Sequence, residues 1–119
     1  NQLKSLGIRT VLFSDHDIDQ IEAAHDIGVD RIEIYTGPYA KAFKENDLKV
    51  IEDYKEAINF AQSIKLDLNA GHDLSLLNLE NFLNLGKIHE VSIGHSLVSE
   101  SLIYGVQETI NKYINIIGN

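Results

Sequence analysis

The sequence predicts an α/β fold in which strands and helices alternate along one small domain. Four short runs rich in β-branched and apolar residues lie at 8–15, 29–37, 65–71 and 89–95, and a helical pattern follows each of them. No low-complexity or linker-like stretch separates these units. Because each helix must carry the chain back to the same end of the sheet, a βα unit repeated four times requires parallel strands.

The first two units are bounded by clear capping and turn signals. The strand at 8–15 runs into a helix that opens with a capping box formed by Asp17 and Gln20. Gly28 ends that helix, and the strand at 29–37 follows it. This strand ends at Gly37-Pro38, a strong turn signal, so we expect a turn and a loop there.

The last two units begin after the longest helical pattern, which we expect from about residue 46 to residue 64. The third strand at 65–71 leads to a short helix at 77–85, and the fourth strand at 89–95 leads to a helix at 96–116. Apolar residues recur every three or four positions in the two long helices. The expected buried residues are Ile51, Tyr54, Ile58 and Ala61 in the first, and Val98, Leu102, Val106, Ile110 and Tyr113 in the second.

Two architectures satisfy a parallel βα repeat: a doubly wound open sheet, or half of a (β/α)8 TIM barrel with two strand edges that need partners. We favour the half barrel. Its basis is the polar residues Glu33, Asp67 and Asn69, which lie within expected strands and suit a barrel interior near its functional rim. The absence of methionine and the helix-like start at residues 1–7 suggest that residues 1–119 belong to a longer chain.

Composition narrows the classes of function. The chain has 119 residues, 44% of them hydrophobic, and carries a net charge of -8, which disfavours nucleic acid as a partner. No apolar run approaches the ~20 residues of a membrane span, and no secretory signal is recognisable, so we expect no membrane partner and a cytoplasmic location. The absence of cysteine excludes disulfides, thiolate metal sites and cysteine nucleophiles.

Candidate site residues follow the strands, because both architectures bind ligands outside the carboxyl ends of parallel strands. Two strands end in Gly-His, and histidine is the usual proton-transfer group near neutral pH. A histidine at this position can also simply cap a helix or face water. The residues at the four strand ends are Asp15-His16-Asp17, Thr36-Gly37, Gly71-His72-Asp73 and Gly94-His95-Ser96.

Two further features point to chemistry at the same rim. Glu33 faces the same side of its strand as Arg31, and an inward carboxylate is either part of a site or part of a structural ion pair. Gly94 and the amides of Ser96 and Leu97 open the last expected helix and could bind an anion, with Ser96 as the N-cap residue.

A metal site is a weaker reading of the rim. Histidines 16, 72 and 95 with aspartates 15 and 73 supply suitable atoms, but they lack a local ligand spacing, so we expect no metal.

Several segments in combination resemble the carboxy-terminal half of the pyridoxine 5'-phosphate synthase family. They are "FSDHD", "QIEAAHDIGVDRIEIYTGPYA", "LDLNAGHDL" and "IHEVSIGHSLVSESL", and the likeness spans essentially all 119 residues in the correct order. The resemblance implies a (β/α)8 barrel of which this chain supplies the last four βα units, with the amino-terminal half absent. It also implies a homo-oligomer, an octamer in this family.

The resemblance further implies an activity and residue roles. The family condenses 1-deoxy-D-xylulose 5-phosphate with 3-amino-2-oxopropyl phosphate, releasing phosphate and water, and needs no metal or organic cofactor. It implies that His72 donates a proton, that Glu33 assists the transition state and that Gly94 and His95 bind a phosphorylated substrate. Asp73 stands where the family often has a glycine that binds substrate through its backbone; that contact could survive in Asp73, although the added carboxylate would repel phosphate.

Two alternatives stay open. Another phosphate-handling barrel, such as an aldolase or epimerase, would need a metal set or a Schiff-base lysine, and Lys41, Lys44 and Lys65 do not follow strands. A non-catalytic half barrel that only binds phosphate is the other. If the chain is half of such a synthase, it is expected to be inactive alone, because the family's other site residues come from the absent amino-terminal half.

Overall fold

The computed structural model describes residues 2–118 and confirms the α/β fold. In chain order the elements are α1 (Gln2–Ser5), β1 (Val11–Ser14), α2 (Ile18–Asp26), β2 (Arg31–Tyr35), α3 (Gly37–Glu45), α4 (Leu48–Ser63), β3 (Asp67–Gly71), α5 (Leu79–Leu83), β4 (Glu90–Ser92), α6 (His95–Tyr104) and α7 (Val106–Ile117). Each expected strand is present, two to four residues shorter than the sequence predicted.

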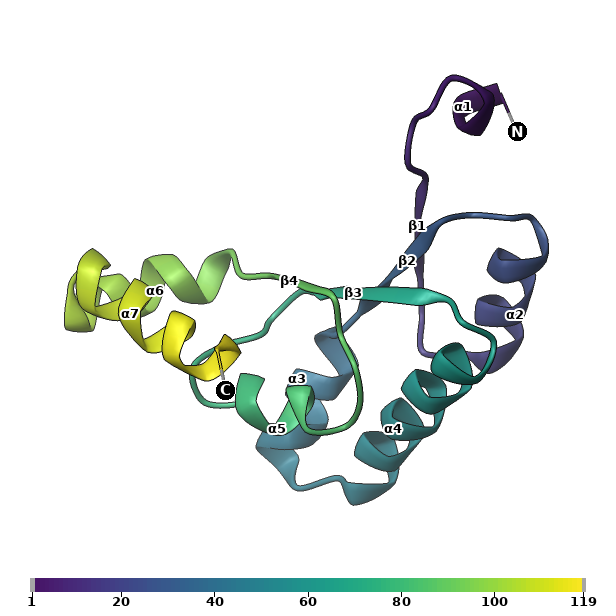
Figure 1. Ribbon diagram of the computed structural model, residues 1–119. Helices are drawn as coiled ribbons and strands as arrows, with labels where there is room; N and C mark the ends of the chain where they lie inside the picture. The colour runs from purple at the N-terminus through teal and green to yellow at the C-terminus, as the bar shows by residue number, and fades with distance from the viewer. Residues whose placement is uncertain (1, 119) are drawn as a thin grey trace.

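The described strands form one parallel sheet in the order β1-β2-β3-β4. Successive parallel strands that always step in the same direction place their connecting helices on one face, because the crossovers share one hand. Figure 1 shows α3, α4 and α5 together on one side of the sheet. A doubly wound sheet would reverse its strand order and carry helices on both faces. The arrangement is therefore consistent with part of a (β/α)8 barrel.

The core lies between the sheet and these helices. Ile32 and Ile34 of β2 and Leu68 and Ala70 of β3 point toward the helices and are buried, as the alternation along each strand predicts. They pack with buried helix residues, namely Ile21, Tyr39, Tyr54, Ala57, Ile58, Ala61, Leu79 and Phe82. The predicted stripe of α4 is thus confirmed for Tyr54, Ile58 and Ala61, while Ile51 is half-buried beside the core.

The opposite face of the sheet carries the polar residues that the sequence singled out. Glu33 pairs in register with Phe13 on one side and Asn69 on the other, and Arg31 pairs with Asp67. These side chains therefore share one face, and Phe13 is 77% exposed there. An apolar ring so open to water indicates a face that is uncovered in this chain.

The expected loop after β2 is wrong, because α3 occupies it. Gly37-Pro38 starts this helix instead of forming an isolated turn, since proline fits the first turn of a helix, where its missing N–H has no helical role. Tyr39 and Ala42 then bury one face of α3. Asn46 ends the helix with a left-handed conformation, and Asp47 caps α4, whose first residue is 48 and not 46.

The single helix expected at 96–116 is also wrong. Gly105, with a positive φ of 86°, breaks the segment into α6 and α7, which pack against each other. The break separates the two halves of the expected apolar stripe, so only Tyr113 of that set is buried. The other four residues of the set, Val98, Leu102, Val106 and Ile110, are exposed.

Local capping follows the sequence in part. The Asp17 carboxylate accepts from the Asp19 amide at the start of α2, as expected for an N-cap. The Gln20 side chain, however, accepts from the Asp15 amide, so the capping box is not closed. No helix within residues 2–118 has the length and apolar character needed to cross a membrane.

Candidate active site

One cavity at the carboxyl ends of the strands brings together the five site residues that the resemblance predicted, namely Glu33, His72, Asp73, Gly94 and His95. It has a volume of about 330 Å³. Its lining comprises Phe13, Glu33, Tyr35, Gly71, His72, Asp73, Ser92, Gly94 and His95. The four described strands and the start of α6 all contribute to it, so most of the rim expected from the topology forms one concave site.

Glu33 of β2 lines this cavity. A Cβ atom added to Gly71 of the neighbouring strand would lie 3.2 Å from Glu33 Oε2, so glycine leaves room for the carboxylate. Arg31, two residues earlier, pairs with Asp67 and Glu90. Across the described residues, no cation lies within ion-pairing distance of Glu33. The structural ion-pair alternative for Glu33 therefore has no support, and its carboxylate is free to act on a ligand.

The His72 corner has an unusual backbone. His72 and Asp73 both have positive φ angles, 100° and 58°, which are rare for residues other than glycine. The Thr36 hydroxyl donates to the carbonyl oxygen of His72 at 2.5 Å. The side-chain amide of Asn78 donates to the carbonyl oxygen of Asp73 at 3.2 Å. Such strain persists only where neighbouring groups fix it, and it clusters at functional sites.

One acidic and one aromatic side chain contact the His72 ring. Its Nδ1 atom lies 3.3 Å from Asp73 Oδ2. The ring of Tyr35 meets it edge-on, with centroids 4.7 Å apart. The His72 side chain is 59% exposed, so it can reach a ligand in the cavity.

The start of α6 differs in detail from the sequence prediction. The helix begins at His95 with Gly94 as the N-cap residue, so the expectation that Ser96 is the N-cap is wrong. The Leu97 amide donates to the Gly94 carbonyl at 3.1 Å, which removes it from the expected anion site. The amides of His95 and Ser96 precede the first intrahelical donor, and the positive end of the helix dipole lies beside the cavity.

His16, the third rim histidine, does not join this cavity. It stacks on Tyr54 with ring centroids 4.1 Å apart, and its Nδ1 atom is buried without a hydrogen-bond partner. No group of three histidine, aspartate or glutamate side chains within residues 2–118 is arranged to hold a metal ion. His16 therefore does not lie with His72 and His95, the grouping that the metal interpretation considered.

Tyr54 of α4 is bonded to Tyr35, one of the residues that line the cavity. Its hydroxyl donates to the carbonyl oxygen of Tyr35 at 2.7 Å, which fixes the end of β2. Burial raises the pKa of the Tyr54 hydroxyl well above its usual range. The hydroxyl therefore stays protonated and remains a hydrogen-bond donor at neutral pH.

Sequence reasoning missed three residues that line the cavity: Phe13, Tyr35 and Ser92. The register of the strands could have predicted them. Tyr35, Gly71 and Ser92 are register partners at the ends of β2, β3 and β4. The three lysines considered for a Schiff base, Lys41, Lys44 and Lys65, do not line the cavity.

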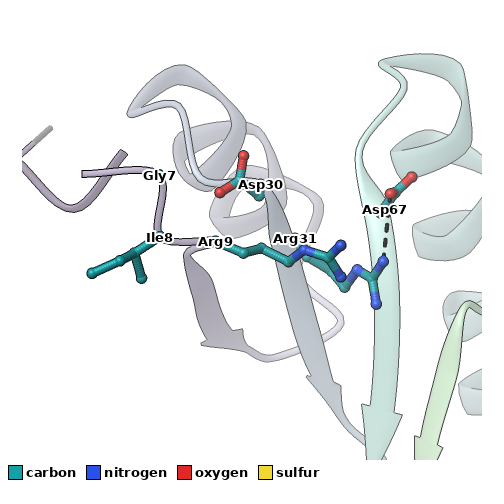
Figure 2. Close-up of a pocket in the computed structure, with 6 residues that line it drawn as sticks. All are labelled: Gly7, Ile8, Arg9, Asp30, Arg31 and Asp67. Carbon is teal, nitrogen blue, oxygen red and sulfur yellow. Dashed lines mark ion pairs between the residues drawn. The ribbon is translucent and has the colours of Figure 1, made fainter. Parts of the chain in front are cut away.

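A larger cavity of about 500 Å³ lies at the opposite, amino-terminal ends of the strands. Figure 2 shows its lining, in which Arg31 pairs with Asp67 and Arg9 extends toward Arg31. Arg31 is also bound to Asn69 Oδ1 at 3.0 Å. In parallel α/β folds this end contributes to stability and not to ligand binding. We therefore assign the functional site to the carboxyl-terminal cavity.

A βα-repeat sheet with acidic, histidine and glycine residues gathered at its carboxyl ends defines an α/β protein with a candidate ligand site at that end. The chain belongs to the family described as "Pyridoxal phosphate biosynthesis protein PdxJ", whose pattern matches residues 1–119. This agrees with the resemblance seen in the sequence.

Relatives named "Pyridoxine 5'-phosphate synthase" are similar to almost the whole chain. The protein of Bacteroides thetaiotaomicron is 44% identical over 116 residues, which are 97% of this chain and 49% of the relative. That of Porphyromonas gingivalis is 45% identical over 113 residues, 94% of this chain and 48% of the relative. The chain therefore spans about half the length of the curated relatives it matches.

Proposed function

We propose that this chain is half of a (β/α)8 barrel and supplies its last four βα units. The sequential strand order, the helices on one face and the uncovered polar face support the proposal. The outer edges of β1 and β4 are unpaired in the described sheet, and open edges of this kind need partners. Completion of the barrel would cover Phe13 and enclose the ion pairs that Arg31 forms with Asp67 and Glu90.

Co-expression tests the barrel directly. The chain is produced with the amino-terminal half of the Bacteroides thetaiotaomicron relative, one half carrying an affinity tag. We expect the two halves to co-purify as one species with strand edges protected from hydrogen exchange. Recovery of the tagged half alone would contradict the half barrel.

We further propose that the complete protein is a pyridoxine 5'-phosphate synthase. It would condense 1-deoxy-D-xylulose 5-phosphate with 3-amino-2-oxopropyl phosphate to give pyridoxine 5'-phosphate, phosphate and water. The observation that carries this proposal is the single cavity that unites all five predicted site residues in a chain of this family. The relatives' name supports the same activity.

Each residue has a role in this reaction. His72 donates a proton during the dehydration steps, from a position where its ring reaches the cavity. Glu33, whose carboxylate is unpaired, stabilises positive charge that develops during imine formation and enolisation. Gly94 and His95 bind a phosphate group at the start of α6, where the free amides and the helix dipole favour an anion.

Asp73 contacts the substrate through its backbone, while its side chain points to His72. The steps need only acid and base groups, so the proposal includes no metal or organic cofactor. The remaining site residues would come from the amino-terminal half, so the chain alone is inactive. We place the protein in the cytoplasm as a homo-oligomer, an octamer by family resemblance, with phosphorylated small molecules as its partners and neither nucleic acid nor membrane.

Activity is tested on the full-length protein that carries this chain. Incubation with both substrates should release one phosphate per molecule of pyridoxine 5'-phosphate formed. Binding of both substrates without any product would instead favour the phosphate-binding module. Turnover that requires an added divalent metal would contradict the acid-base scheme.

A further inference from the structure

We propose that Asp73 is a positioning residue that holds the His72 imidazole in the orientation and tautomer needed for proton transfer. This inference rests on the proposed function, because it assumes that His72 is the proton donor. It assigns the Asp73 side chain a role other than substrate contact.

The two side chains are in direct contact. His72 Nδ1 and Asp73 Oδ2 lie 3.3 Å apart, and both residues line the cavity. A carboxylate at this distance favours a proton on Nδ1, which leaves Nε2 as the nitrogen that exchanges a proton with the ligand. Asp73 thereby selects which nitrogen acts.

The backbone is built to bring these neighbours together. Adjacent side chains ordinarily diverge, but here two successive residues have positive φ angles. The carbonyl oxygen of His72 is held by the Thr36 hydroxyl, and that of Asp73 by the Asn78 amide. Asn78 also accepts from the Ser75 amide at 2.9 Å, which closes the turn. One hydrogen bond from a distant residue, Thr36, and one from the nearby Asn78 therefore maintain a costly conformation in which the His72 and Asp73 side chains meet.

Tyr35 limits the ring on another side. Its ring meets that of His72 at an interplanar angle of 66°. Tyr35 in turn lies over Gly37, where an added Cβ atom would fall 2.5 Å from the Tyr35 hydroxyl oxygen. With Asp73 at Nδ1 and Tyr35 at its ring, the imidazole has a defined position in the cavity.

The same contact explains how a carboxylate fits beside a phosphate site. Glu33, Tyr35 and His95 are the other titratable groups that line the cavity. The Asp73 carboxylate lies 3.3 Å from Nδ1 of His72, so a ring N–H at this atom partly offsets its negative charge.

The test uses Asp73→Asn in the full-length protein. Asparagine keeps the size of the side chain and tolerates a positive φ, so the variant removes the charge with little change of backbone. We expect kcat to fall about 10-fold and KM for both substrates to stay within about twofold, because orientation is lost and binding is not. Nitrogen-15 NMR of the His72 ring should show a smaller fraction of the Nδ1-protonated tautomer.

Asp26→Asn is the matched control. His25 and Asp26 on α2 form a comparable neighbouring pair, with Nδ1 and Oδ1 3.5 Å apart, outside the cavity. This control should retain the parental kcat. If Asp73→Asn folds poorly, Asp73→Gly replaces it, since glycine accepts the positive φ, and the same loss of kcat is expected.

Two results would overturn the inference: a parental kcat in Asp73→Asn, or an unchanged His72 tautomer despite a lower kcat. His72→Asn separates this failure from that of the proposed function. Normal turnover in His72→Asn would refute the role of His72 itself. An inactive His72→Asn beside a fully active Asp73→Asn would refute only the role of Asp73.

Discussion

The hydroxyl of Thr36 donates a hydrogen bond to the carbonyl oxygen of His72, with the two oxygen atoms 2.5 Å apart. Thr36 follows β2 and is fully buried, whereas His72 follows β3 and reaches the cavity. The Thr36 amide also donates to the carbonyl oxygen of Gly71 at 3.0 Å. Thr36 therefore links the end of β2 to the end of β3, where the proposed proton donor His72 lies.

Thr36→Val should loosen that corner. Valine has the shape of threonine but leaves the His72 carbonyl without its donor, so we expect a loss of about 1–3 kcal/mol in the free energy of unfolding, measured by denaturant titration. The kcat should fall with it. Thr36→Ser retains the hydroxyl and should keep most of the activity; equal loss in both variants would show that the hydrogen bond is not the cause.

Gly71→Ala should displace the carboxylate of Glu33. The added Cβ would lie 3.2 Å from Glu33 Oε2 and 3.2 Å from Ser92 Cβ, which is tight enough to move one of them. We expect kcat to drop about 10-fold, since small misplacements of reacting groups are costly. Combining the change with Ser92→Gly relieves only the second contact. Full recovery of kcat in the double variant would show that Glu33 was not the group displaced.

Gly94→Ala should weaken phosphate binding without weakening the fold. A Cβ at Gly94 would meet no atom within 4 Å, so packing does not require glycine there. The new methyl group would occupy the space by which a phosphate approaches the first amides of α6. Calorimetry with inorganic phosphate should show a Kd raised several-fold at an unchanged melting temperature. An unchanged Kd would place the phosphate elsewhere.

Stability should decline at alkaline pH. Burial raises the pKa of the Tyr54 hydroxyl above its unfolded value of about 10. Below that pH the Tyr54 hydroxyl is protonated in both the folded and the unfolded protein, so its full contribution to the free energy of unfolding is present. Above it the unfolded state loses the proton first, so the free energy of unfolding falls as pH rises. Burial raises the pKa of Tyr39 and Tyr113 as well, which adds to the slope.

Tyr54→Phe isolates the contribution of one hydroxyl. It should reduce the alkaline slope while costing about 1 kcal/mol at neutral pH through loss of the bond to the Tyr35 carbonyl. The measurement is chemical denaturation at a series of pH values. An identical slope in the variant and the parent would mean that Tyr54 ionises equally in both states.

The sequence was sufficient for the sheet and for the location of the candidate site. Alternation in "RIEIY" placed Ile32 and Ile34 in the core and Glu33 on the other face, because a strand has only two faces. Parallel order then brought the ends of β2, β3 and β4 together. Glu33, His72 and His95 share a cavity for that reason alone.

The errors arose where one residue permits two backbone conformations. Gly37-Pro38 suits a turn and the first turn of a helix equally, and the burial of Tyr39 against Tyr54 and Phe82 decides for the helix. Gly105 interrupts a regular apolar spacing, and its positive φ ends α6 where the pattern continues. Tertiary contacts, which local sequence does not contain, settle both cases.

The contact between His72 and Asp73 lies outside the reach of sequence patterns. Adjacent residues in "GHDL" carry no indication of two positive φ angles. The conformation depends on Thr36 and Asn78, which lie 36 residues before His72 and 5 residues after Asp73 respectively.

The most direct test of the account is the effect of His72→Asn on the full-length protein. Asparagine accepts the positive φ of this position but cannot donate a proton as an acid. We predict that formation of pyridoxine 5'-phosphate slows about 10²- to 10⁴-fold, the usual contribution of a general acid, while Kd for inorganic phosphate stays within about twofold. Turnover at the parental rate would show that the end of β3 does not supply the proton.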